Sequence, residues 1–567
     1  MTKLYKIHQK RIRFIVLGIL FLISITTAKT LYIQVFKSKT IENYVSREAK
    51  GERGVILDRN GVKLAYDAQF YDLFLSKEDS AKFGAVEYFV KEYFDRNIDI
   101  DSLANRSKQS SFRLVKKVPK RRIIELKSIL AEYPCIEKSM EYTDRYYPKK
   151  DLGSQLIGKF SHTKNKKGLW GVEYSMDDSL KGGVSTMPFF ITSRGFRKED
   201  FSEEEFEKLS GNDITLTIDI EYQRILEQEL TGQLKKTNSR TANGIIVNPY
   251  NGELLALASV PGSDLNKGLS SKEQSRDYST SYNYEPGSTL KPFSILAGLK
   301  ENKITLLDKY YCEKGEYFIP NINRKIIDHD PNDTLTVKEV LAYSSNIGMA
   351  KISLKVGKES IYKTLNAFGF GEKTGISSYK EEKGYLKSIQ DWNEHSRISI
   401  SIGQEVNATN LQLAMAYSAI ANGGYLLKPK IIKKISAGTL EEEPISIVRK
   451  VASREHLDLL IEALKMTVTD GTASSMFSND FCSYGKTGTS QVFDSNENKY
   501  SDSIFVASYA GVFPCDSPKL VCIISFLEPE MKYRWATQTA VPVVEKVLNK
   551  ILIKDKGLAI AVSDEIK

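Results

Sequence analysis

Cysteine and histidine are scarce in this chain, which has five of each among 567 residues. No two cysteines stand in a CxxC spacing and no histidines gather near them, so the sequence argues against a zinc site. The low cysteine density also argues against a small fold held together by disulfides. Cys515 and Cys522 flank a predicted turn and strand, and we expect both to be buried as small hydrophobic side chains.

The chain also lacks a compact basic stripe interleaved with aromatic residues, although its formal net charge is +10. Its lysines and arginines are dispersed, so nucleic acid is not a predicted partner. A dispersed positive charge is usual for a solvated surface, and it also suits an anionic membrane or wall polymer. Repeats and low-complexity segments are absent, and the length is ample for more than one globular core.

Long hydrophobic runs are missing except near the N-terminus, where residues 14–36 carry one charge, that of Lys29. This segment is long enough to cross a bilayer, with Lys29 snorkelling to the far interface. The basic residues within 1–13 predict a cytoplasmic tail and a single-pass anchor in the cytoplasmic membrane, with everything that follows on the periplasmic side. A cleaved signal peptide, with Thr26 and Ala28 at a weak cleavage site, is the alternative.

Residues 37–210 are polar and carry short strand and helix patterns. Asn60-Gly61 lies between two apolar runs and predicts a hairpin turn. The acidic stretch Glu199 to Glu207 marks a boundary with the next domain. We therefore predict a separate domain over 37–210.

Residues 211–555 predict a second domain, followed by a tail at 556–567. Strand patterns occur near its start and again at 503–513 and 520–527, with a mainly helical stretch between them. A sheet built from both ends of a domain, with helices between, is an α+β arrangement.

The sequence EPGSTLKPF places Ser288 and Lys291 three residues apart at the predicted start of a helix. This spacing projects both side chains from one helix face. A serine hydroxyl needs an adjacent base to attack a carbonyl at neutral pH, and a lysine can serve only when it is neutral. The helix dipole, desolvation and a second cation each lower the pKa of a lysine. Ser288 is therefore the predicted nucleophile and Lys291 the predicted base.

Two further motifs follow along the chain. Thr336 and Glu339 have the spacing of a capping box and predict the start of a short helix. Ser344 and Asn346 follow on a predicted loop between two helices, although serine and asparagine are also ordinary turn residues. Lys486, Thr487, Gly488 and Thr489 form a K-T-G-T sequence on a predicted edge strand. A strand edge presents backbone N–H groups to a ligand, and the glycine permits close approach.

Each motif is weak alone, because the chain holds further copies at Ser161–Lys164, Ser377–Lys380 and Lys373–Gly375. Those copies lie in polar or glycine-rich stretches without the expected helix or strand. The order S-x-x-K, S-x-N, K-T-G is that of serine acyl-transfer enzymes. Order and local context together select Ser288, Ser344 and Lys486.

At these residues the sequence resembles class B penicillin-binding proteins. The likeness runs through RGVILDRNG, GLWGVEY, GIIVNPYNGELLALAS, EPGSTLKP, YSSNIG, ISIGQEVNATNLQLAMAYSAIANGG, GKTGTSQ and ASYAGVFP. EPGST before the lysine, and SSN in place of an SCD-like form, favour the septal cell-division member. Asn410 stands where the family often has proline.

The resemblance implies an α+β fold with a transmembrane helix, an elongated pedestal or dimerisation domain, and a transpeptidase domain combining an antiparallel sheet with a helical subdomain. It implies a serine D,D-transpeptidase that cross-links peptidoglycan and is a β-lactam target, with no metal and no cofactor. The implied partners are lipid-linked stem peptides, the membrane, a polytopic glycosyltransferase and divisome proteins. No large glycosyltransferase domain or wall-binding repeats are expected within the chain.

The resemblance also implies a role for each motif residue. Ser288 attacks the penultimate D-Ala carbonyl and Lys291 takes its proton. Ser344 and Asn346 relay a proton to the leaving amine and hold the substrate amide. Lys486 supplies the positive field for the terminal carboxylate, which Thr487 and Thr489 hydrogen-bond. The backbone N–H groups of Ser288 and Thr489 form the oxyanion hole.

Three alternatives remain open from the sequence. An elongation-type transpeptidase would act on the lateral wall. A β-lactam-hydrolysing or sensing protein of the same fold would need a base for its deacylating water. A receptor or divisome scaffold would keep the fold without the chemistry.

Overall fold

The structure is a computed structural model, and it describes residues 2–37, 44–161, 166–191, 197–199, 209–267, 271–319, 324–376, 380–436, 444–476, 482–494 and 499–555. The chain divides into two compact units. The first comprises Met1–Arg53 and Lys181–Gly211, and the second Gly54–Leu180 and Asn212–Lys567. The predicted tail at 556–567 and most of the acidic stretch Glu199 to Glu207 lie outside the described residues.

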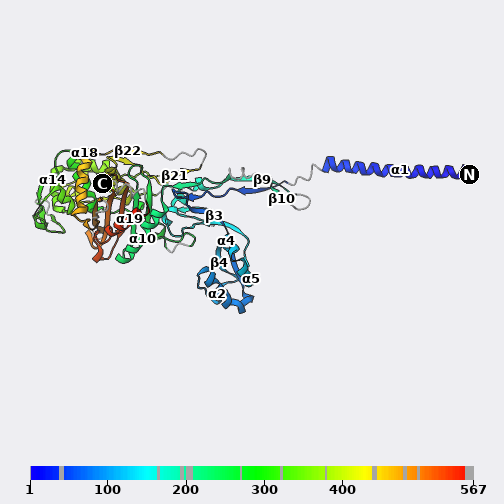
Figure 1. The fold of residues 1–567 in the computed structure, drawn as a ribbon. Coiled ribbons are helices and arrows are strands. Elements are labelled where there is room, and N and C mark those ends of the chain that lie inside the picture. Colours follow the sequence, from blue (N-terminus) through cyan, green and yellow to red (C-terminus); the bar gives the residue numbers. More distant parts are fainter. Residues whose placement is uncertain are drawn as a thin grey trace. The chain divides into compact units, whose positions relative to one another are not determined.

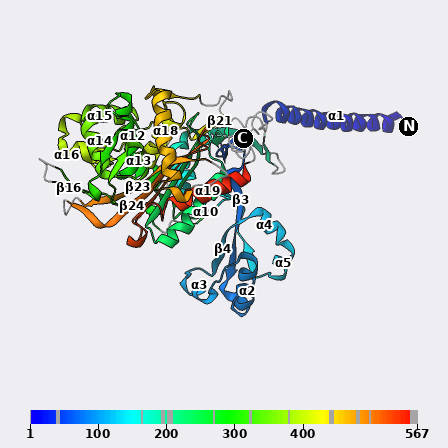
Figure 2. The same ribbon diagram turned by 60° about the vertical axis from the view of Figure 1, so that its left-hand side comes forward.

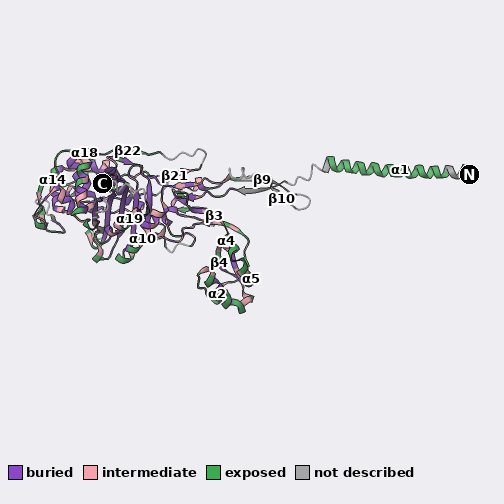
Figure 3. Ribbon diagram, in the orientation of Figure 1, coloured by how far each residue is buried: buried purple, intermediate pink, exposed green. Residues whose placement is uncertain are grey.

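The first unit contains the predicted apolar helix. Helix α1 spans Thr2–Tyr32 and continues into a π-helical turn, Ile33–Lys37 (Figure 1). Within it, Ile7–Val35 is long and apolar enough to cross a membrane, and its side chains are exposed in this chain (Figure 3). The same unit holds a three-stranded antiparallel sheet of β1 (Tyr44–Lys50), β9 (Val184–Ile191) and β10 (Arg197–Glu199).

The second unit begins with a lobe built on the long strand β3 (Lys63–Ser76). Strand β2 (Ile56–Leu57) pairs with β3 across the predicted Asn60-Gly61 turn, which is confirmed. The other strands on β3 are β4 (Ser111–Pro119), β5 (Ile136–Lys138) and β6 (Tyr142–Tyr146). Helices α2 (Phe83–Phe94), α3 (Ile100–Arg106), α4 (Lys120–Glu125) and α5 (Lys127–Glu132) complete the lobe.

Buried Arg145 ties three segments of this N-terminal part together. Its guanidinium donates to Glu173 Oε1 at 2.7 Å, to the Gly54 carbonyl at 2.8 Å and to Asp67 Oδ1 at 3.2 Å. Glu173 is also fully buried. Loss of either Arg145 or Glu173 would therefore leave the other with a buried charge that its ion-pair partner no longer compensates. The remaining elements of this part are α6 (Ser154–Ile157), β7 (Lys159–Ser161), β8 (Lys167–Trp170), α7 (Gly171–Ser175) and α8 (Asp177–Leu180).

The centre of the second unit is a five-stranded antiparallel sheet in the order β13-β12-β25-β24-β23. Its strands come from both ends of the domain, as predicted, and β23 lies at an edge. They are β12 (Thr241–Val247), β13 (Leu254–Val260), β23 (Tyr484–Asp494), β24 (Lys499–Phe513) and β25 (Leu520–Leu527).

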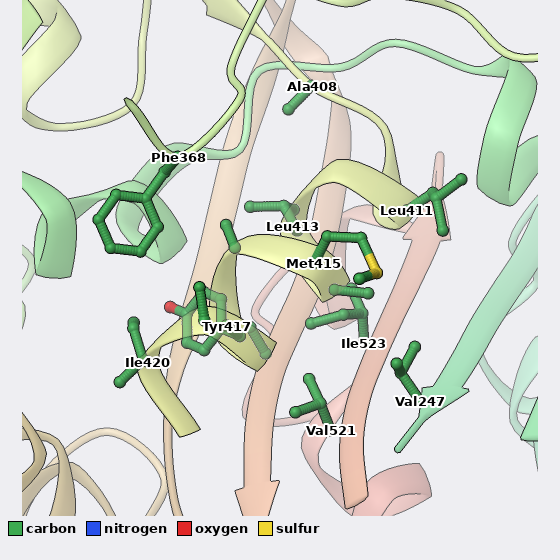
Figure 4. Packing of buried hydrophobic residues seen from close by; sticks show 14 of the residues in the cluster. Val247, Phe368, Ala408, Leu411, Leu413, Met415, Tyr417, Ile420, Val521 and Ile523 are labelled. Carbon is green, nitrogen blue, oxygen red and sulfur yellow. The ribbon is translucent and has the colours of Figure 1, made fainter. Parts of the chain in front are cut away.

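Both faces of this sheet are buried, and the side chains of alternate residues pack on opposite faces. On β25, Val521 and Ile523 belong to the same core as α17 (Asn410–Ala421) (Figure 4). Cys522 and Ile524 face the opposite layer, which contains α10 (Ile220–Thr237) and α19 (Val541–Lys554). Every residue of α17 is buried, so this helix is the central layer between the sheet and the remaining helices.

A helical subdomain stands beside the β23 edge (Figure 2). Its helices are α12 (Lys291–Lys300), α13 (Val337–Ala342), α14 (Asn346–Val356), α15 (Lys358–Ala367), α16 (Glu394–Ser401) and α18 (Arg454–Thr469). The short helix α11 (Tyr278–Ser281) packs instead on β12 and β13, at the opposite edge of the sheet. The chain between them forms two-stranded antiparallel sheets, which pair β14 (Lys309–Tyr311) with β17 (Thr334–Thr336), β15 (Glu316–Ile319) with β16 (Arg324–Ile327), β18 (Tyr385–Leu386) with β19 (Val406–Asn407), and β20 (Tyr425–Leu427) with β22 (Ile447–Lys450). Strand β11 (Ile214–Leu216) bridges β21 (Ile432–Ile435) and β2, which connects the lobe to this domain.

The cysteines differ in part from expectation. Cys522 is a buried thiol, as predicted. Cys515 is instead bonded to Cys482, with Cα atoms 5.3 Å apart. The bridge was not foreseen because the two residues are 33 positions apart and meet only when β23 pairs with β24. It joins the residue two positions before β23 to the residue two positions after β24.

Phe293 anchors helix α12 in the core. Its ring lies 4.9 Å from Phe368, 5.1 Å from Phe370 and 5.6 Å from Tyr417, measured between centroids.

We expect Phe293→Ala to lower the free energy of unfolding by ~3–5 kcal/mol, because the cavity left by the ring cannot close. Denaturant unfolding of the purified protein measures this. Phe318→Ala, at an exposed phenylalanine, is the control and should change stability by under ~0.5 kcal/mol. Equal effects of the two changes would contradict the packing described.

Candidate active site

The predicted nucleophile lies on a tight turn directly before helix α12. Gly287–Leu290 forms a 3₁₀ turn, and Gly287 has φ +57°, a conformation that glycine adopts without strain. The Gly287 N–H donates to the Gly403 carbonyl at 3.1 Å, and a side chain at Gly403 would collide with the Gly287 backbone. From the other side the Tyr417 hydroxyl donates to the Thr289 carbonyl at 2.8 Å. These contacts hold Ser288 in place.

Lys291 is fully buried directly below this turn. Its Nζ lies 2.6 Å from the Ser344 carbonyl oxygen, 2.8 Å from Oδ1 of Asn346 and 3.2 Å from Ser344 Oγ. Burial lowers the pKa of Lys291 to about 7, and the Asp328 carboxylate opposes that shift. A neutral amine has two N–H donors and one lone pair. Two carbonyl acceptors and one hydroxyl therefore match a neutral Lys291.

Ser344 connects the lysine with the nucleophile. Its Oγ lies 3.0 Å from Ser288 Oγ, so a hydrogen-bonded path runs from Ser288 through Ser344 to Lys291. Ser344 has φ 63°, which few residues other than glycine adopt. The predicted capping box of Thr336 and Glu339 is present at the start of α13, and Asn346 begins α14.

Asp328 holds this loop, although no sequence signal pointed to it. Its Oδ1 accepts from the N–H groups of Asn346 at 2.5 Å and Ile347 at 3.0 Å. Its Oδ2 accepts from the Ser345 hydroxyl at 2.5 Å. Asp328 is buried beyond the β15–β16 hairpin, and only the fold brings it to the start of α14.

The K-T-G-T sequence occupies the free edge of the sheet, as predicted. The carbonyl oxygen of Thr489 lies 3.1 Å from the position that a Cβ on Gly287 would take. The N–H and C=O of one strand residue point to the same side, so the Thr489 N–H also faces the nucleophile turn. A Cβ on Gly488 would stand 2.8 Å from the Pro286 carbonyl oxygen, which explains the glycine.

Lys486 is the second fully buried lysine of the site. Its Nζ lies 3.2 Å from both the carbonyl and the hydroxyl oxygen of Thr487. Burial, and then the charge of Lys291, hold the pKa of Lys486 well below its usual range. Two buried lysines in one site cannot both stay protonated without an anion, so the site electrostatically favours a ligand carboxylate.

Two residues outside the motifs position the threonines. The Thr472 hydroxyl shares a 2.7 Å hydrogen bond with the Thr487 hydroxyl. The Ala536 N–H donates to Thr489 Oγ1 at 3.2 Å. Neither belongs to a recognisable pattern. The structure thus brings Ser288, Lys291, Ser344 and Asn346 into one network and places the K-T-G-T edge against the turn that carries Ser288.

The described residues of the other motif copies belong to other elements. Thr374 and Gly375 are in a loop, where their N–H groups bind the Glu381 carboxylate. Ser161 ends the short strand β7. Ser377 lies outside the described residues.

Comparison with known proteins identifies the family. Residues 48–216 match the model of the penicillin-binding protein dimerisation domain, and residues 243–552 that of the penicillin-binding protein transpeptidase domain. The chain belongs to the penicillin-binding protein transpeptidase family, and the two domains together make it a class B penicillin-binding protein. The predicted α+β fold and the predicted enzyme class, a D,D-transpeptidase, are confirmed.

The chain is 28% identical to stage V sporulation protein D of Bacillus subtilis, over 88% of this chain and 78% of that protein. It is also 28% identical to the peptidoglycan D,D-transpeptidase FtsI homolog of Mesostigma viride, over 93% of each. Among solved structures, penicillin-binding protein 3 of Mycobacterium tuberculosis in complex with aztreonam has the same fold. The TM-score is 0.68 at 21% identity, over 90% of this chain and 97% of that one.

The pKa of Lys291 leads to a test of Asp328. If acylation needs neutral Lys291, its rate rises with pH through about 7 and then reaches a plateau. Asp328→Asn removes a charge that raises this pKa, so the midpoint should move to lower pH by about one unit. The plateau rate should fall about ten- to hundredfold, because the Ser345–Asn346 loop loses its charged acceptor. Stopped-flow acylation by a penicillin between pH 5 and 9 measures both quantities.

Asp330→Asn is the matched control, since Asp330 is close in sequence but exposed. Its profile should overlay that of the unchanged protein. Coincident midpoints for Asp328→Asn and the unchanged protein would show that Asp328 does not act on Lys291.

Proposed function

We propose that this protein is a membrane-anchored serine D,D-transpeptidase that cross-links peptidoglycan stem peptides through an acyl-enzyme on Ser288. We further propose that it works in septal wall synthesis during cell division. The observation that carries the chemistry is the network of Ser288, Ser344 and buried Lys291, with distances of 3.0 and 3.2 Å.

Acylation begins when the Ser288 oxygen attacks the penultimate D-Ala carbonyl. The Ser288 proton passes to the Ser344 oxygen, and Ser344 gives its own proton to neutral Lys291. Lys291 is held so that its two N–H bonds point to carbonyl oxygens, which supports a lone pair aimed at Ser344. Lys291 then returns a proton through Ser344 to the nitrogen of the departing D-Ala. The bond between that nitrogen and the attacked carbonyl carbon breaks, and the peptide remains as an ester on Ser288.

The negative charge on the attacked carbonyl oxygen is stabilised by the N–H groups of Ser288 and Thr489. Donors fixed in advance and aimed at a developing charge supply a large part of the rate enhancement in acyl transfer. The Thr489 strand edge and the Ser288 turn already face one another across this position. Asn346 holds the substrate amide and also orients Lys291.

The terminal carboxylate of the stem peptide binds at the K-T-G-T edge. Lys486 supplies the positive field, while Thr487 and Thr489 donate hydrogen bonds and Gly488 lets the peptide approach. A bound carboxylate favours protonation of Lys486, and the departing D-Ala carries that anion away. An amine from a neighbouring stem then attacks the ester, forms the cross-link and releases Ser288. β-Lactams present a similar carbonyl and carboxylate and acylate the same serine.

We assign the chain a cytoplasmic tail at 1–13, a single-pass anchor at 14–36, a pedestal domain at 37–210, a transpeptidase domain at 211–555 and a tail at 556–567. The apolar helix Ile7–Val35 and the basic residues before its apolar part support an N-terminus in the cytoplasm. The pedestal then carries the catalytic domain on the periplasmic side, where its substrates are lipid-linked precursors and nascent wall.

The septal role rests on the EPGST and SSN sequences and on the FtsI homolog among the relatives. An enzyme that only cross-links needs a partner that polymerises glycan. We therefore propose a polytopic glycosyltransferase and divisome proteins as partners in the membrane.

Ser288→Ala should abolish covalent labelling by a fluorescent penicillin, because no other hydroxyl contacts the Ser344–Lys291 network among the described residues. Mass spectrometry of the unchanged protein should place the adduct on the peptide that contains Ser288. Ser161→Ala, at another S-x-x-K copy, is the control and should label normally. An adduct at another residue would refute the assignment, and one that hydrolyses within seconds would favour a β-lactam-hydrolysing enzyme.

The division role predicts the position of the protein in the cell. A fluorescent fusion of the full chain should form a band at midcell in dividing cells, and Ser288→Ala should still reach that band while failing to support division. Fluorescence microscopy in a depletion strain measures both. Patches along the side wall would favour the elongation-type alternative, and growth of the Ser288→Ala strain would favour a scaffold.

A further inference from the structure

A pocket of about 460 Å³ lies directly beyond the catalytic strand edge. One wall is Ser490–Phe493, the continuation of β23 after Thr489, and another is Tyr282–Glu285, which leads into the nucleophile turn. Glu405 and Tyr500 also line it. We call it the Glu285 pocket. The pocket is therefore built from the residues that precede the nucleophile turn and those that follow Thr489 on β23.

The pocket contains two buried acceptors without partners. Oδ1 of Asn283 and Oε2 of Glu285 are both buried and make no hydrogen bond to any residue that the structure describes. The other carboxylate oxygen of Glu285 accepts from the Glu405 N–H at 2.9 Å and from the Tyr500 hydroxyl at 3.0 Å. Buried acceptors are rarely left unpaired, because each loses its hydration without return. The residues that carry them, Asn283 and Glu285, both line the same cavity, so a ligand there that donates hydrogen bonds would supply the missing partners.

The charges around the pocket favour a cationic donor. Lys387 also lines it, but its Nζ lies 3.7 Å from Glu405 Oε2 and donates to Ser396. Glu405 accepts in addition from the Ser396 hydroxyl and lies beside His395. No cation among the described residues forms an ion pair with Glu285. Burial raises the pKa of Glu285 to about 7, its two hydrogen bonds oppose that shift, and the Glu405 charge adds to it. An ammonium group would satisfy this carboxylate.

The substrate chemistry supplies such a group, and this step rests on the proposed function. Cross-linking requires an amine on the accepting stem, and donor and acceptor stems are repeats of one polymer. Each donor stem therefore also carries an amine. A donor whose carboxylate lies at Lys486 runs antiparallel to β23, so its upstream residues follow Thr489 toward Ser490–Phe493. That direction leads into the pocket.

We propose that the Glu285 pocket binds the side-chain ammonium of the donor stem, on the residue directly before D-Ala-D-Ala, with Glu285 and Asn283 as its acceptors. The enzyme thereby selects donors whose amine is free and rejects those whose amine has already been used in a cross-link. Glu285 is a specificity residue and takes no part in the acylation of Ser288.

The test uses two matched donor peptides that end in D-Ala-D-Ala, in which the preceding residue is lysine or N-acetyl-lysine. With the full-length protein in detergent, release of D-Ala gives kcat/KM for each donor without any acceptor. We expect the free amine to be preferred about 10- to 100-fold, the size of one charge-assisted hydrogen bond to a buried carboxylate. In Glu285→Gln the preference should fall to within about threefold of unity. The ratio is independent of the fraction of active protein, so a general loss of activity does not imitate the result.

A second variant, Gln491→Lys, adds a cation at the pocket wall and keeps Glu285. It should also reduce the preference for the donor with a free amine, because the added charge repels an ammonium group. Glu301→Gln, at an exposed glutamate away from the pocket, is the control and should retain it. If turnover is too slow to measure, protection of Ser288 against penicillin labelling by the two donors gives the same ratio. Equal use of both donors, or an unchanged preference in Glu285→Gln, would overturn the proposal.

Three outcomes distinguish failure of this inference from failure of the proposed function. If penicillin labels Ser288 and both donors react equally, only the pocket assignment fails. If Glu285→Gln leaves donor choice unchanged but raises the KM for an amine acceptor, the pocket serves the acceptor and the donor assignment is wrong. If penicillin does not label Ser288, the transpeptidase mechanism itself fails, and this inference with it.

Discussion

The chemistry of the site depends on burial of the Lys291 amine away from water. A lysine in water is protonated at neutral pH and cannot accept a proton, whereas complete burial lowers the pKa of Lys291 to about 7. That burial is tolerated because each hydrogen-bonding site of the neutral amine has a partner on the Ser344–Asn346 loop. Asp328 holds the loop in turn, so a carboxylate outside the motifs sets the geometry on which the base depends.

The surrounding layers make this arrangement rigid. Helix α17 is buried on all sides between the sheet and the helical subdomain, and its Tyr417 bonds to the nucleophile turn. Asn410, the departure from the family pattern, begins the same helix. Its side chain accepts from the Tyr284 hydroxyl and donates to the Ser525 hydroxyl, which connects the segment before Ser288 to the sheet. Asn410 is therefore a buried polar residue whose amide oxygen and amide nitrogen each have a hydrogen-bond partner.

The edge strand β23 organises the site along one line. Lys486 and Thr487 form its carboxylate end, Thr489 faces the nucleophile turn, and Ser490 begins the wall of the Glu285 pocket. An extended peptide advances about 3.3 Å per residue, so successive substrate groups meet successive parts of one strand. Lys486 at one end and the Glu285 carboxylate, which has no cationic partner among the described residues, at the other give the cleft a polarity that matches a peptide with an anionic terminus and a cationic side chain.

Local sequence determined the elements and the motif residues. Alternation, hairpin turns and capping patterns are short-range signals, so the Asn60-Gly61 turn, the Thr336 cap and the edge position of Lys486 followed from a few residues each. Motif order and resemblance selected Ser288 over the other S-x-x-K copies. Tertiary structure alone decided which distant groups support them. Asp328, Thr472 and Ala536, the Cys482–Cys515 bridge and the unpaired acceptors at Asn283 and Glu285 depend on contacts across the fold. Burial and hydrogen-bond satisfaction belong to the assembled core, and no stretch of sequence encodes them locally.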